Sequence, residues 1–224
     1  PRPKFREIGG REMKRPLLQN EAFLKDVREA PQDRRQFNLW WLGQSGFLIQ
    51  SQKHHALIDP YLSDSLTTKY ASTEKPHVRM TERVVEPDQL DFINVVTSSH
   101  NHTDHFDPET LTPLMEKNPR MQIVIPEANR VVAAERLKVN AGVFIGMNSG
   151  KMKSAGTFRF QGVPAAHNEF NKNPWGEHPY LGYIIEMGMF RIYHAGDTLL
   201  WDGLVDYVRP FKVDVAILPI NGNR

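Results

Sequence analysis

The sequence predicts a four-layer αββα sandwich, in which two β-sheets pack face to face and helices cover their outer faces. Strands dominate the predicted elements of residues 37–59 and 143–193, whereas strands alternate with helices over residues 92–137 and 194–218. The chain has 224 residues, of which 40% are hydrophobic, so it can bury a large core. No repeat of solenoid length is visible.

The first 36 residues are charged, contain proline and are only weakly periodic. They carry ten Lys and Arg against six Asp and Glu, a net charge of +4 in a chain whose total is +2. We interpret residues 1–36 as a basic N-terminal extension with a short helix over 20–29, and residues 37–224 as the folded domain. The extension could contact nucleic acid or anionic lipid, but a solvated arm is the simpler interpretation, and no nucleic-acid partner is expected.

Three strands bounded by turn residues open the domain. They are predicted at 37–42, 47–50 and 56–59. The polar turn before the third strand contains His54 and His55, which we expect at the tip of the turn, and Asp59 stands at the end of that strand. The long polar segment 61–90 is predicted to be a loop or lid near the site, because connections of this length are usually functional or mobile.

The apolar run at 92–98 predicts a buried strand, and Asp107 and Pro108 are suited to begin a helix that ends at Lys117. Residues 148–153 form a predicted polar turn. The remaining predicted strands are 121–125, 143–145, 157–163, 180–187, 190–193 and 213–218, and the remaining helices are 127–137 and 199–208.

A cluster of possible metal ligands follows the strand at 92–98. Within six residues it contains His100, His102, Asp104 and His105. Imidazole and carboxylate groups both bind divalent metals, and two histidines two residues apart point to one side of an extended chain. Asp104 and His105 follow where the chain turns, so they can face a neighbouring position. The spacing therefore favours two adjacent metal ions over one, and over a polar loop with surface histidines.

Two other strand ends offer the missing ligands. His167 follows a strand and two alanines, and Asp197 follows Gly196, which permits a tight turn that aims the carboxylate inward. We expect His167 and Asp197 to be ligands, with Asp197 bridging both metals. His194 and Asp59 are expected to orient ligand histidines rather than to bind metal. The chain has no cysteine, so any metal must be held by histidine and carboxylate.

These residues carry a resemblance to the metallo-β-lactamase-fold hydrolases. The pattern is His100-x-His102-x-Asp104-His105, then His167, then Gly196-Asp197-Thr198, and the resemblance covers about residues 37–222. Four further segments resemble the branch that contains L-ascorbate-6-phosphate lactonase. They are Trp41-Leu42-Gly43, Leu57-Ile58-Asp59-Pro60, Tyr193-His194-Ala195-Gly196-Asp197-Thr198 and Leu218-Pro219-Ile220-Asn221-Gly222. Enzymes like N-acylphosphatidylethanolamine phospholipase D share the general pattern and remain a competing assignment.

The resemblance implies an αββα fold with its site at the edge between two sheets. It implies that His100, His102 and His167 hold a first metal, and that Asp104, His105 and the bridging Asp197 hold a second. It also implies one more histidine on a final strand. Because the sequence stops at Arg224, we expect the C-terminal helix and strand of the fold to be missing from it.

The expected function is that of a metal-dependent hydrolase. Two divalent ions, Zn²⁺ or Mn²⁺, would hold a hydroxide that attacks a small anionic ester or a phosphorylated sugar lactone, with Asp104 as catalytic acid and base. Asn168, Asn221 and Arg224 are candidate contacts to this small-molecule substrate, and Arg83 and Lys172 are candidate anion-binding residues. The alternatives are a phosphodiesterase and a non-catalytic binding module.

The expected cellular compartment depends on whether the sequence contains a signal peptide or a membrane-spanning segment. The sequence contains neither the apolar core of a signal peptide nor an apolar run long enough to span a membrane. We therefore expect a cytoplasmic protein without a transmembrane segment. The sequence leaves open whether it forms a homo-oligomer.

Overall fold

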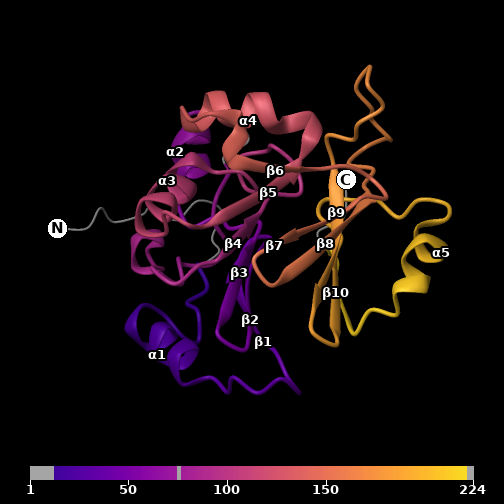
Figure 1. Cartoon of the computed structure of the whole chain (residues 1–224). Helices are drawn as coiled ribbons and strands as arrows, with labels where there is room; N and C mark the ends of the chain where they lie inside the picture. The colour runs from indigo at the N-terminus through magenta and orange to yellow at the C-terminus, as the bar shows by residue number, and fades with distance from the viewer. Residues whose placement is uncertain (1–12, 75–76, 221–224) are drawn as a thin grey trace.

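The computed structural model describes residues 13–74 and 77–220, and two β-sheets lie at its centre (Figure 1). The first sheet has six strands in the order of the sequence: β1 (Asn38–Gly43), β2 (Gly46–Ser51), β3 (His54–Ile58), β4 (Val95–Thr97), β5 (Gln122–Pro126) and β6 (Phe144–Met147). Strands β1 to β3 are antiparallel, and β3 to β6 are parallel. The C-terminal ends of β3 and β4 therefore meet at one edge.

The second sheet has five strands, in the order β11-β10-β9-β8-β7. They are β7 (Met152–Ala155), β8 (Phe158–Pro164), β9 (Leu181–Met187), β10 (Phe190–His194) and β11 (Val215–Ile217). Strands β7 to β10 are antiparallel, and β11 joins β10 in parallel. This sheet brings the ends of β8 and β10 toward the edge that β3 and β4 form.

Helices lie outside both sheets (Figure 1). They are α1 (Glu21–Glu29), α2 (Ser65–Tyr70), α3 (Pro108–Lys117), α4 (Arg130–Leu137) and α5 (Leu204–Val208), with short 3-10 turns η1 (Pro87–Gln89), η2 (Glu127–Asn129), η3 (Ala141–Val143) and η4 (Arg209–Phe211). Helix α3 begins as predicted, because the Asp107 carboxylate accepts a hydrogen bond from the Glu109 backbone N–H and Pro108 fills the first turn. In the described part of the chain, every helix is too short or too polar to cross a bilayer.

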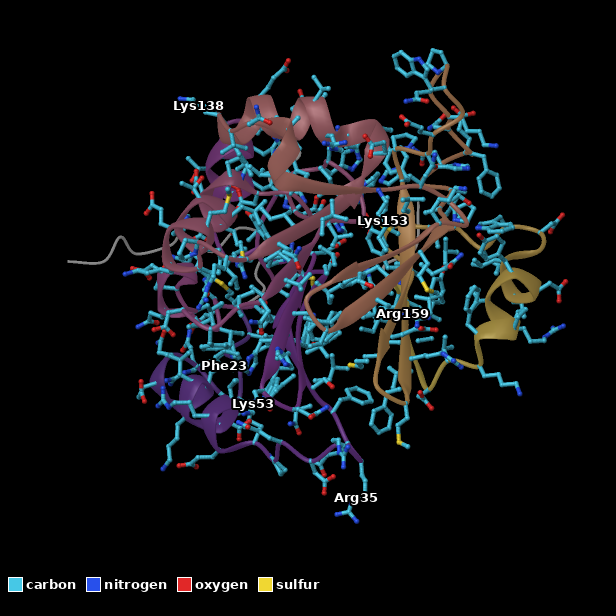
Figure 2. All side chains as sticks on the ribbon, viewed as in Figure 1. Phe23, Arg35, Lys53, Lys138, Lys153 and Arg159 are labelled. Atoms are coloured by element: carbon cyan, nitrogen blue, oxygen red, sulfur yellow. The ribbon has the colours of Figure 1, made fainter. Side chains whose placement is uncertain are left out.

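Three hydrophobic clusters lie between adjacent layers, and this layered packing confirms the predicted αββα sandwich. One lies between the sheets and includes Ile49 and Val95 from the first sheet and Phe158 and Ile185 from the second. Figure 2 shows side chains projecting into the space between the two sheets. A second cluster joins the first sheet to α1, α3 and α4, and a third joins the second sheet to α5. Helix α1 lies in the predicted N-terminal extension, yet its Phe23 packs in the second cluster.

Several local predictions differ from the structure. Strand β7 begins at Met152, within the turn predicted at 148–153. Helix α5 begins at Leu204 rather than at residue 199, because Gly203 before it has a left-handed backbone. Segment 61–90, which was predicted as a loop or lid, contains regular structure. It contains α2 and η1, and buried Arg79 donates hydrogen bonds to the backbone carbonyls of Tyr61 and Ser63.

The prediction that His54 and His55 sit at the tip of a turn was wrong. The turn is at Gln52 and Lys53, and both histidines belong to β3. His55 is buried, packs edge-on against Phe92, and accepts a hydrogen bond from the Gln50 amide at Nε2. The sequence signal was misleading because a two-residue turn leaves His55 inside β3, on the face of the first sheet that α1 covers.

Buried His55 is expected to make the stability of the protein depend on pH. Burial, with a smaller contribution from His54, lowers the pKa of His55 from 6.5 to about 4. Between these values the unfolded chain binds a proton that the folded chain does not. The free energy of unfolding should therefore fall as the pH is lowered through this window, by up to about 3 kcal/mol. Urea unfolding from pH 7 to pH 4 measures this slope.

The matched variants are His55→Gln and His54→Gln, which change neighbouring residues of one strand. His55→Gln should flatten the slope between pH 6.5 and 4 relative to the wild type, whereas His54→Gln should keep it. Equal slopes for the wild type and His55→Gln would contradict the assignment.

Candidate metal centre

Four chain segments meet where the edges of the two sheets come together: the loop after β4, the segment after β8, the start of β9 and the turn after β10. The loop after β4 carries His100 to His105, the segment after β8 carries His167, and the turn after β10 carries Asp197. Backbone hydrogen bonds join these segments: the Leu181 N–H donates to the Ser99 carbonyl at 3.0 Å, and the Leu199 N–H donates to the Ala166 carbonyl at 2.7 Å. The fold therefore gathers predicted ligands that are up to 97 residues apart in sequence.

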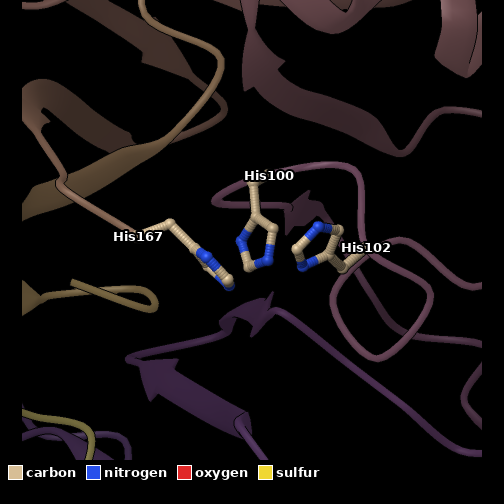
Figure 3. A group of neighbouring side chains, drawn as sticks. All are labelled: His100, His102 and His167. Carbon is tan, nitrogen blue, oxygen red and sulfur yellow. The ribbon is translucent and has the colours of Figure 1, made fainter. Parts of the chain in front are cut away.

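The first group consists of His100, His102 and His167. One ring nitrogen from each lies within 4.8 Å of the others, a spacing that could hold a metal ion. Figure 3 shows the three rings side by side, with His100 between the other two. Tyr180 stacks on the His167 ring at a centroid distance of 5.0 Å and also lies near His100. Tyr180 was not among the predicted site residues, because an aromatic residue before a strand carries no ligand signal.

The second group consists of His100, His105 and Asp197, whose ligand atoms also lie within 4.8 Å of one another. The Asp197 Oδ2 atom is 3.3 Å from His105 Nε2 and 3.9 Å from His167 Nε2, so this carboxylate stands between the two groups. The Asp104 Oδ2 atom is 3.6 Å from His105 Nε2. Asp197 therefore faces both groups, whereas Asp104 lies beside the second group without belonging to it.

The turn that carries Asp197 depends on a glycine. Gly196 has φ +60°, and a Cβ atom there would lie 2.8 Å from the Ser99 Cβ. Such a contact is too short for any side chain, so Gly196 lets the turn approach the histidine loop closely.

Asp59 supports the second group through contacts with His105 and Ser99. Its carboxylate is fully buried at the end of β3 and accepts hydrogen bonds from the Ser99 backbone N–H at 2.9 Å and from the Ser99 hydroxyl. The same carboxylate lies 2.7 Å from His105 Nδ1 and 3.3 Å from the Thr97 hydroxyl. A carboxylate on the far nitrogen of a ligand histidine fixes the ring and its tautomer, so Asp59 turns His105 Nε2 toward Asp197.

Two buried ring nitrogens without hydrogen-bond partners indicate that this site fits a metal. His100 Nε2 and His105 Nε2 are buried and have no hydrogen-bond partner, although the other nitrogen of each ring has a polar neighbour. Buried polar atoms are normally paired, and in a neutral imidazole a ring nitrogen without a partner can offer its lone pair to a metal. With only nitrogen and oxygen donors, these groups suit Zn²⁺ or Mn²⁺.

The pKa shifts describe the same electrostatics. Burial, together with the neighbouring histidines, lowers the pKa of His100 well below its usual range, so its ring is neutral. Burial alone would lower the pKa of His105, but Asp197 and Asp59 together raise it to about 10. Burial alone would raise the pKa of Asp197, but the combined effect of His105, His167 and His194 lowers it. The centre therefore favours positive charge beside His105, which a divalent cation can supply.

The other candidate residues are distributed as follows. His194 is buried at the end of β10, and its Nδ1 atom has no hydrogen-bond partner. Asn168 is exposed next to His167. Arg83 forms ion pairs with Asp64 and Glu86. Asn221 and Arg224 lie outside the described residues, and Lys172 lies near His178, whose pKa it helps to lower after the larger effect of burial.

The chain is similar to known proteins in sequence and in fold. A family model described as a beta-lactamase superfamily domain matches residues 38–224. A UPF0173 metal-dependent hydrolase of Thermus thermophilus is 30% identical over 186 residues, which cover 80% of this chain and 69% of that protein. Another, of Caldivirga maquilingensis, is 29% identical over 184 residues, covering 82% and 70%. A solved metallo hydrolase from Ignicoccus hospitalis shares the fold, with a TM-score of 0.55 and 23% identity over 83% of this chain and 71% of that one.

Proposed function

This chain belongs to the metallo-beta-lactamase superfamily of metal-dependent hydrolases, and we propose on that premise that it uses two divalent ions to hydrolyse a small anionic ester or lactone. The observation that carries the proposal is a pair of buried nitrogens without a hydrogen-bond partner, His100 Nε2 and His105 Nε2, beside the Asp197 carboxylate. A binding module without catalysis would not need two adjacent ligand groups with a carboxylate between them.

The ligands divide between the two positions. His100, His102 and His167 would hold one ion, while Asp104, His105 and the shared Asp197 would hold the other. Bound divalent ions would supply a water molecule of lowered pKa and would polarise the electrophilic centre of the substrate. Zn²⁺ and Mn²⁺ both accept this nitrogen and oxygen donor set.

The side chains around the ions have separate tasks. The Asp104 carboxylate, about a quarter exposed at 28%, can take a proton from the attacking water and return it to the leaving group. Asp59 and Ser99 keep the His105 ring oriented through the hydrogen bonds described above. Burial keeps His100 neutral, and a neutral imidazole is the form that binds metal.

The substrate class rests on the sequence segments that resemble the L-ascorbate-6-phosphate lactonase branch. Two of them border the centre: Asp59 in Leu57-Ile58-Asp59-Pro60 contacts His105, and Tyr193-His194-Ala195-Gly196-Asp197-Thr198 carries the shared carboxylate. A lactone carbonyl suits a site built to activate water, and a phosphate or carboxylate on the ring would make the substrate anionic.

Hydrolysis assays on metal-loaded protein test this function. The protein should be stripped with a chelator, reloaded with Mn²⁺ or Zn²⁺, and assayed on phosphorylated sugar lactones, simple esters and phosphodiesters. We expect metal-dependent hydrolysis of the lactones that disappears on stripping and returns on reloading. Cleavage of phosphodiesters alone would replace the lactone assignment with the phosphodiesterase alternative, and no hydrolysis of any substrate would support the binding alternative.

A further inference from the structure

We propose that Arg136 is a positioning residue that holds the metal-ligand loop in its binding shape before any metal arrives. The inference rests on the proposed metal centre. Arg136 lies in the last turn of α4, outside the ligand groups and 31 residues beyond His105. Its guanidinium reaches over the loop that carries His102, Asp104 and His105.

The guanidinium contacts both ends of this loop. Its Nη1 atom donates to the carbonyl of Asn101, and its Nη2 atom donates to the carbonyl of Phe106 at 2.8 Å. Nη2 also lies 3.3 Å from the Thr103 hydroxyl, and the guanidinium carbon stands 5.3 Å from the centre of the Phe106 ring. One planar group therefore joins the residues that flank the ligands on each side.

Within the loop, the backbone forms a tight turn that sets the ligand directions. The N–H groups of His105 and Phe106 both donate to the carbonyl of His102, at 3.0 Å and 2.7 Å. This turn aims His102 at the first group and His105 at the second. Because Arg136 fixes residues 101 and 106, it prevents the turn from opening, and the ligand groups stay assembled without the energy of metal binding.

Lysine cannot replace this contact. Arginine presents a planar fork of donors that can serve two carbonyls at once, whereas the lysine ammonium is a point charge on a flexible stem. A purely electrostatic role would therefore survive Arg136→Lys, and a positioning role would not.

Arg130, on the same helix, is the matched control for Arg136. Its guanidinium also donates to a backbone carbonyl, that of Ala141 at 3.0 Å, and it pairs with Glu127. This contact ties α4 to η3 and not to the ligand loop. Arg130→Met should lower thermal stability as Arg136→Met does, yet it should leave metal affinity unchanged.

The test is the affinity for Mn²⁺ or Zn²⁺ alone, measured by competition with a chelator on stripped full-length protein whose folding is checked by circular dichroism. We expect Arg136→Lys and Arg136→Met to bind metal about 10–100-fold more weakly than the wild type, as removal of groups behind metal ligands typically does. Wild-type affinity in folded Arg136→Met, or full rescue by Arg136→Lys, would overturn the proposal. A wild type that binds no metal would overturn both the positioning role and the proposed function.

Hydrogen exchange on the wild type tests the same idea without a substitution. If Arg136 keeps the loop assembled, the amides of His105 and Phe106 should be protected in metal-free protein about as well as those of α4. Exchange of these two amides as fast as in an open loop would show that the turn forms only with metal, and would overturn the proposal even if the Arg136 variants failed to fold.

Discussion

Replacing Asp104 with alanine is expected to lower kcat/KM for hydrolysis by about 10²–10⁴-fold, the usual contribution of a positioned acid and base. The carboxylate lies 3.6 Å from His105 Nε2 and is partly open to solvent, so it can both touch the second ion and exchange a proton with substrate and water. The loss should appear mainly in kcat, because His100, His102 and His167 remain to hold the first ion.

Two further variants separate the role of Asp104 from general charge effects. Asp104→Asn keeps the size of the side chain but cannot accept a proton, so it should be nearly as inactive as Asp104→Ala. Asp202→Asn removes an exposed carboxylate five residues after Asp197 and should keep wild-type activity. An Asp104→Ala protein that loads two metals and retains wild-type kcat would show that this residue has no part in proton transfer.

Replacing Asp59 with alanine should cost about 3–5 kcal/mol of the free energy of unfolding, because removing one partner of a buried polar network leaves the others unpaired. The Ser99 backbone N–H, the Ser99 hydroxyl, the Thr97 hydroxyl and the His105 ring would all lose their acceptor in a fully buried place. His105 would also be free to rotate, so metal affinity should fall together with stability. Urea unfolding and chelator competition measure the two effects.

Asp59→Asn is the matched variant for this position. Residue 59 has φ +43°, a conformation that asparagine and aspartate adopt more readily than alanine. Asparagine therefore keeps the backbone and one acceptor oxygen, but its amide N–H₂ cannot accept from Ser99 or His105. The expected order of stability is wild type, then Asp59→Asn, then Asp59→Ala. Equal stability for all three proteins would contradict the network.

The fold was predictable because its signals are local. The αββα architecture followed from the change between strand-rich stretches and strand–helix alternation, and α3 was placed correctly by Asp107 and Pro108. His100, His102, His167 and Asp197 were predicted as ligands because each follows a strand, and the structure brings their side chains together. Ends of neighbouring strands meet in space, so residue type and strand position were sufficient to anticipate that meeting.

The remaining features depend on packing between distant elements, which no local pattern reports. The sequence places His55 beside a polar turn, and only the packing of α1 and Phe92 on that face of the first sheet buries it. Arg136 is an ordinary basic residue at the end of a helix until α4 packs over the ligand loop. Tyr180 likewise reaches His167 only through the approach of β9 to the end of β8.

Locating the metal ions in the structure is the most direct test of whether two of them bind at this sheet edge. Crystals of the protein loaded with Mn²⁺ or Zn²⁺ should show two anomalous peaks. We predict one peak among the ring nitrogens of His100, His102 and His167, and the other among Asp104, His105 and Asp197, with Asp197 between them. No peak at either group, or metal bound only elsewhere on the chain, would contradict the account.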